Sequence, residues 1–168
     1  MKIIVFKRVA TAVAVTVIFL FSFTSCKKYK KNTVDPTRRT TIQLSGSQEV
    51  PANNSTGTGT GQIAFNPTSK TITYSVTWQL GSPDATTDNM HFHGADNGSD
   101  ATSSAVVIGI TGFTTASSGT FSSVTRALTD TEVNQLLAGK WYLNIHSSTI
   151  PAGELRGNIK FGQVVVGY

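Results

Sequence analysis

The sequence predicts an all-β fold, and this prediction rests on three observations. Charged residues make up 14% of the 168-residue chain, against a usual ~25%, and this low charge, with frequent Thr and Gly, argues against a helical bundle or a coiled coil. Residues 71–80 alternate between apolar and polar side chains, as a strand with one buried and one solvated face does. Turn residues recur at short intervals after Thr40. We therefore expect a Greek-key β-sandwich of about seven or eight short antiparallel strands.

The beginning of the chain is similar to a bacterial lipoprotein signal peptide. A positively charged start precedes the uncharged apolar run 9–23, which is short for a membrane span. The run leads into Thr24-Ser25-Cys26, where small residues precede the single cysteine as in a lipobox. We expect residues 1–25 to be the signal peptide and Cys26 to carry the lipid. The alternatives are an uncleaved signal anchor and a plain secretory signal.

Most of the positive charge lies outside the expected domain. Nine of the 14 basic residues fall within residues 1–39, whereas residues 40–168 carry five basic and eight acidic side chains. Residues 26–39 are therefore predicted to be a basic tether between the lipidated Cys26 and a folded domain at 40–168. Because that domain is net acidic, nucleic acid is not an expected partner. The lipid instead makes a membrane the expected partner, on the extracytoplasmic side of the bacterial cell envelope.

The remaining elements follow along the domain in order. Polar residues 53–61 are expected to form a loop that runs into a strand ending at Phe65. The capping-box sequence Thr129-Asp130-Thr131-Glu132 predicts one short helix that Gly139 ends, placed at one end of the sandwich. Other short strands are expected at residues 41–44, 71–80, 89–94, 105–110, 119–124, 140–146 and 154–161.

Five short motifs, in this order and spacing, resemble the CHRD domain, which is named after chordin and also occurs in bacterial secreted and lipid-anchored proteins. The resemblance implies an extracellular, immunoglobulin-like sandwich without a settled molecular activity in its bacterial members. After His93-Gly94 the sequence departs from the Pro-Ala element that the family usually has there. The motifs are LSGSQEVP at 44–51, HFHG at 91–94, LLAG at 136–139, YLNIH at 142–146 and GELRGNI at 153–159.

All three histidines of the chain fall in these motifs. His91 and His93 are two residues apart on an expected strand, so their side chains share one face about 7 Å apart at the backbone. This spacing suits two ligands to one Zn²⁺ or Cu²⁺ ion, and His146 completes a three-histidine site if its strand is adjacent. The alternative is that the histidines hydrogen-bond within a polar sheet face. The nearby candidates for a fourth or outer-shell ligand are Asp88, Asp96 and Asp100.

A second set of charged residues lies in the first and last motifs. Glu154 and Arg156 share a face of the last expected strand, and Glu49 can pair with Arg156 if the terminal strands meet. We expect a structural ion pair, in which the guanidinium grips a carboxylate with two hydrogen bonds. The alternative is an acid–base carboxylate pair of a hydrolase.

Together these features predict a lipid-anchored cell-envelope domain with a binding or structural role rather than an enzyme. Its expected partners are the membrane and either an envelope protein or a glycan. Copper or zinc at the three histidines is the cofactor that the alternative, a metal-binding module, would use.

Overall fold

The computed structural model describes residues 35–162, which form one curled antiparallel sheet of eight strands and one α-helix. The predicted signal peptide at 1–25 and Cys26 lie outside the described residues. No helix in the described part is long and apolar enough to cross a membrane. The strands are β1 (Arg38–Ser45), β2 (Thr58–Asn66), β3 (Thr71–Gln79), β4 (Thr87–Gly94), β5 (Val106–Ile110), β6 (Ser118–Val124), β7 (Trp141–Ser147) and β8 (Leu155–Ile159).

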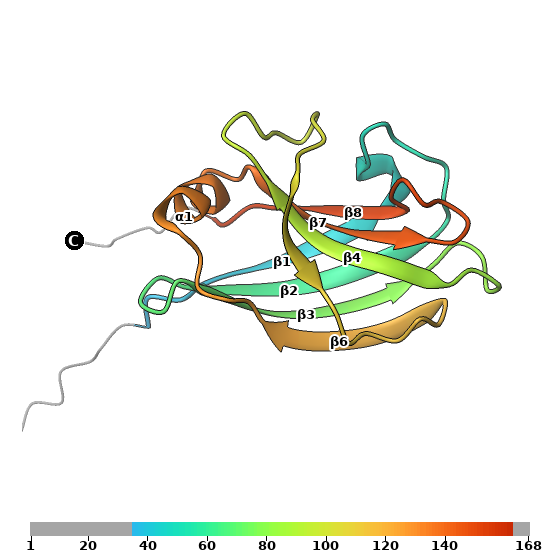
Figure 1. Cartoon of the computed structure of the whole chain (residues 1–168), viewed down its shortest axis with the longest axis horizontal. Helices are drawn as coiled ribbons and strands as arrows, with labels where there is room; N and C mark the ends of the chain where they lie inside the picture. The colour runs from blue at the N-terminus through green and yellow to red at the C-terminus, as the bar shows by residue number, and fades with distance from the viewer. Residues whose placement is uncertain (1–34, 163–168) are drawn as a thin grey trace, which may run out of the picture. The chain divides into compact units, whose positions relative to one another are not determined.

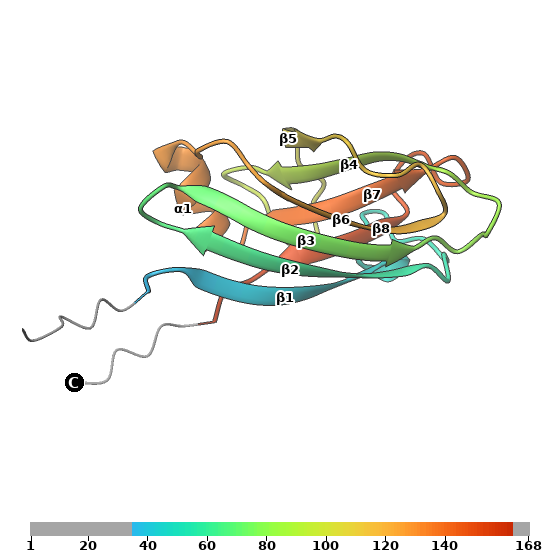
Figure 2. The ribbon, with the colours of Figure 1, turned by 90° about the horizontal axis from the view of Figure 1, so that it is seen from below.

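The strand order divides the sheet into two halves. The order is β5-β4-β7-β8-β1-β2-β3-β6, and β8 meets β1 through the single pair Ser45↔Arg156. We call β5-β4-β7-β8 the histidine half-sheet and β1-β2-β3-β6 the hydroxyl half-sheet. Figures 1 and 2 show how the sheet curls so that the two halves lie across from one another.

The predicted all-β class, with eight short antiparallel strands and one short helix, is confirmed. The Greek-key, immunoglobulin-like sandwich is not confirmed. A sandwich consists of two separate sheets, whereas here all the strands belong to one hydrogen-bonded sheet that bends at the β8–β1 contact. The sequence pattern fixes which face of a strand is buried but not which strands are neighbours, and so it could not separate these arrangements.

The hydrophobic core fills the space between the two halves. The alternation of β3 is borne out, since Ile72, Val76 and Trp78 are all buried. Across the core, the ring of Tyr74 meets the ring of Phe92 on β4 edge to face, with centroids 5.1 Å apart. The indole N–H of Trp78 donates to the Thr87 hydroxyl at 2.8 Å. These contacts between β3 and β4 fix the spacing of the two halves.

The helix α1 (Asp130–Leu137) forms where the capping box predicts it. The Thr129 hydroxyl accepts from the Glu132 amide, and the Glu132 carboxylate accepts from the Thr129 amide. Leu136 is fully buried, and Gly139 ends the segment with a φ of 70°, which glycine adopts without a steric penalty. Figure 1 shows α1 at one end of the curled sheet.

Two elements near the first strand differ from expectation. β1 begins at Arg38 rather than at Thr41, because β2 is long enough to offer Phe65 and Ala64 as backbone partners to Arg38 and Arg39. The strand therefore includes the last two residues of the predicted tether. A short 3-10 helix, η1 (Gly46–Gln48), follows it.

Two loops cover the outward face of the histidine half-sheet. We call residues 46–57, between β1 and β2, cover loop 1 and residues 95–105, between β4 and β5, cover loop 2. The loops touch, since the Ser103 hydroxyl donates to the Val50 carbonyl at 2.9 Å. Beneath them β7 is buried on both faces for most of its length. A layer of polar side chains is consequently enclosed between strands and loops.

Candidate metal centre

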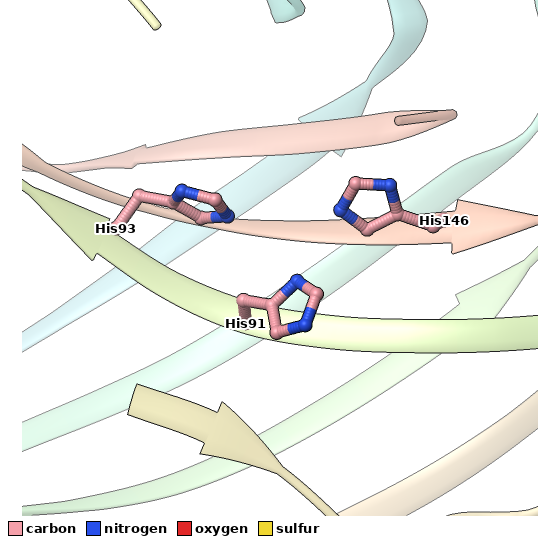
Figure 3. A group of neighbouring side chains, drawn as sticks. All are labelled: His91, His93 and His146. Atoms are coloured by element: carbon pink, nitrogen blue, oxygen red, sulfur yellow. The ribbon is translucent and has the colours of Figure 1, made fainter. Parts of the chain in front are cut away.

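The three predicted histidines converge at one place on the outward face of the histidine half-sheet. His91 and His93 extend from β4 and His146 extends from β7. One ring nitrogen from each lies within 4.8 Å of those of the other two. Figure 3 shows one nitrogen of each ring turned toward the space between them. The condition for a three-histidine site, adjacent strands carrying the motifs, is thus met.

The register of β4 and β7 produces this arrangement. His91 lies directly opposite Asn144. His146 lies opposite Asn89, which is the next residue before His91 on the same face of β4. His146 is therefore a diagonal neighbour of His91, and diagonal side chains on adjacent strands are within reach of one another. The ring centroid of His91 is 5.1 Å from that of His146 and 5.5 Å from that of His93. A shift of one residue in register would turn His146 to the core side.

Backbone carbonyls hold two of the rings. The Nδ1 atom of His93 lies 2.8 Å from the Ser104 carbonyl oxygen, and that of His146 lies 2.8 Å from the Pro151 carbonyl oxygen. A carbonyl only accepts, so each Nδ1 carries the hydrogen, and in the neutral ring the lone pair resides on Nε2. Metal-binding histidines are commonly oriented by such a bond from the nitrogen that does not bind the metal.

Two buried nitrogens of the cluster have no hydrogen-bond partner among the described residues. They are Nδ1 of His91 and Nε2 of His146. Buried polar atoms in folded proteins are nearly always hydrogen-bonded, so an unpartnered pair in one place calls for an explanation. A cation bound between the rings would supply the missing partner for both.

The surroundings favour the neutral form of His91 and His93. Burial lowers the pKa of His91, and repulsion from the neighbouring His146 and His93 lowers it further. Burial also lowers the pKa of His93 and outweighs the Ser104 carbonyl and Asn144 amide oxygens, which favour the protonated ring. Both imidazoles are therefore uncharged at neutral pH, which is the form that binds a metal ion.

A stack of flat groups lies behind His93. The ring of Tyr142 is parallel to that of His93, with centroids 4.7 Å apart and an interplanar angle of 4°. The Arg156 guanidinium covers the other side of Tyr142, 3.6 Å from its centroid. Arg156 is fully buried and donates to the Ser99 and Thr102 carbonyls of cover loop 2, each at 3.0 Å. Arg156 thus fastens cover loop 2 to the sheet, and the Ser104 carbonyl of the same loop orients His93.

The predicted ion pair of Glu49, Glu154 and Arg156 has a different form in the structure. All three side chains are buried, but none of them takes part in the four ion pairs of the described residues. Burial raises the pKa of Glu49 to about 7, although the charge of Arg156 and the polar side chain of Asn144 oppose the shift. Glu49 and Arg156 thus interact through space, and the expected two-bond grip is replaced by hydrogen bonds from Arg156 to loop carbonyls.

Glu154 instead fastens cover loop 1. Its Oε1 atom accepts from the Ser55 hydroxyl at 2.6 Å and from the Gly81 amide at 2.7 Å. Burial by itself would raise the pKa of Glu154, but its hydrogen bonds outweigh burial and lower the pKa. This carboxylate is a structural anchor between the loop and the sheet.

The three aspartates considered as further ligands point elsewhere. Asp88 accepts from the Thr86 hydroxyl and Asp96 accepts from the Gln135 amide, while Asp100 pairs with Lys160. Asn144, which sequence reasoning missed, lies in the cluster instead, with Oδ1 3.0 Å from Nε2 of His93. Its one signal in the sequence is its position two residues before His146 on the same strand face.

Comparison with known proteins gives one result. A family model described as the CHRD domain matches residues 40–159, the span that contains every strand from β2 to β8 and most of β1. No curated protein and no solved structure matches the chain.

Proposed function

We propose that this chain, which belongs to the CHRD domain family, is a β-domain whose binding function is to hold one transition-metal ion, zinc or copper, on His91, His93 and His146. The observation that carries the proposal is the convergence of three ring nitrogens within 4.8 Å. Three imidazoles are a frequent ligand set for both ions and leave a coordination position open.

Two further features support a metal rather than a purely structural role for the histidines. Bonds to carbonyl oxygens occupy Nδ1 of His93 and of His146, which leaves Nε2 of each ring as the lone-pair nitrogen. Hydrogen bonding within the sheet, the alternative role, would satisfy the ring nitrogens, yet two of the buried ones lack a partner among the described residues. The lowered pKa values of His91 and His93 reduce the competition between protons and metal.

We also propose that the domain is held at a membrane of the bacterial cell envelope by a lipid on Cys26. The support is the lipobox-like Thr24-Ser25-Cys26 after an apolar run, in a chain with a single cysteine. Mass spectrometry of the membrane-extracted protein tests this, since an N-terminal acylated Cys26 supports it and an unmodified or absent cysteine contradicts it.

The metal proposal is tested with the full chain purified in detergent and stripped of metal. Calorimetric titration with Zn²⁺, and separately with Cu²⁺, is expected to show about one equivalent bound. The His91→Ala/His93→Ala double variant is expected to lose that binding, because one imidazole alone is a weak site. Thr77→Val, on the solvent side of β3, is the control and is expected to bind as the wild type does. Equal binding by the wild type and the double variant would overturn the proposal.

A further inference from the structure

Asn144 lies beside the histidine cluster. It lies directly opposite His91, and on its own strand His146 follows two residues later on the same face. The side chain is 3% exposed, and its Oδ1 atom is 3.0 Å from Nε2 of His93. The register of β4 and β7 therefore places one amide oxygen beside three imidazoles.

In the neutral form of His93, the contact with Asn144 has no hydrogen to share. Nδ1 of His93 donates to the Ser104 carbonyl, so Nε2 of the neutral ring carries a lone pair. The amide oxygen that faces it carries lone pairs as well. Two acceptors at 3.0 Å repel one another, and a cation that both of them bind would turn the repulsion into attraction.

We propose that Oδ1 of Asn144 is the fourth ligand of the metal ion held by His91, His93 and His146. This inference rests on the proposed function. The resulting set of three nitrogens and one oxygen suits a four-coordinate divalent ion. A hard oxygen donor disfavours the soft Cu⁺ ion, so the site selects Zn²⁺ or Cu²⁺ over Cu⁺.

The test compares Asn144→Leu, which has a similar shape but no donor, with the full-length wild type in detergent. Zn²⁺ affinity is expected to fall about tenfold or more. The visible absorption of bound Co²⁺, which reports the ligand set, is expected to change in band position and intensity. Asn89→Leu is the matched control, because Asn89 is exposed on the same face of β4, two residues before His91. It should leave both readouts unchanged.

The outcomes separate this inference from the proposed function. If the wild type binds no metal, the three-histidine proposal has failed. If the wild type binds and Asn144→Leu gives the same affinity and the same Co²⁺ spectrum, Asn144 is not a ligand. Should Asn144→Leu not fold, Asn144→Asp decides, because a carboxylate ligand must alter the Co²⁺ spectrum, and an unaltered spectrum overturns the proposal.

Discussion

The two halves of the sheet both present a polar outward face, but the faces differ in burial and charge. One cross-strand row of the hydroxyl half-sheet consists of Gln43, Thr60, Thr77 and Thr120, all neutral and on the solvent side. The corresponding row of the histidine half-sheet consists of Gly109, His91, Asn144 and Arg156, and the last two of these are almost completely buried.

The difference comes from the loops rather than from the strands. Arg156 binds two carbonyls of cover loop 2, and Glu154 binds the hydroxyl of Ser55 in cover loop 1. Enclosed charges and imidazoles have shifted pKa values, whereas hydroxyl groups in water have ordinary hydrogen bonds and no charge to shift. Covering one polar face is thus what turns it into a candidate site.

The largest expected effect comes from removing the anchor of the covered face. Arg156→Met leaves two loop carbonyls and the Asn158 amide oxygen without their donor, and it should lower the free energy of unfolding by about 4 kcal/mol. Urea denaturation measures this change. Arg126→Met, which removes a half-exposed ion pair with Glu132, is the control and should cost about 1 kcal/mol or less. Equal losses would show that burial of Arg156 adds nothing.

A smaller effect concerns the pH dependence that the covered face creates. The pKa of Glu49 is raised by burial from 4.5 to about 7, so the folded state binds a proton more tightly than the unfolded state does. The resulting stabilisation is complete below pH 4.5 and is lost as the pH rises through 7. The lowered pKa values of His91 and His93 act in the opposite direction below pH 6.5.

Glu49→Gln isolates the contribution of Glu49, because the histidines are common to both proteins. Without metal, the stability of the wild type relative to this variant should decrease by about 2–3 kcal/mol between pH 4.5 and pH 8. Denaturant titrations across this range provide the measurement. A difference that is constant with pH would mean that Glu49 ionises in the folded protein as it does in water.

The smallest effect is expected on the solvent-exposed face. The Thr77 and Thr120 hydroxyls share a hydrogen bond of 2.9 Å. Thr77→Val removes this bond, but water can take the place of the lost hydroxyl because the site is exposed. The change in unfolding free energy should be about 0.5 kcal/mol or less, measured by the same urea titration. A loss comparable with that of Arg156→Met would contradict the contrast between the two faces.

Local patterns predicted the elements well. The alternation of residues 71–80 identified β3 and its buried side, and the capping box located α1. The spacing of His91 and His93 placed them on one face of a strand. Each of these features depends on a few neighbouring residues, because backbone geometry repeats every two residues in a strand and every 3.6 in a helix.

The rest depends on contacts between distant parts of the chain. Only the register of β4 against β7 brings His146 and Asn144 to His91, and only the folded loops bury Arg156 and Glu49. Likewise, only the pairing of β8 with the end of β1 joins the two halves into one curled sheet. A sequence determines the period and sides of its strands by itself, but which strands meet, and what covers them, is decided by packing across the whole domain.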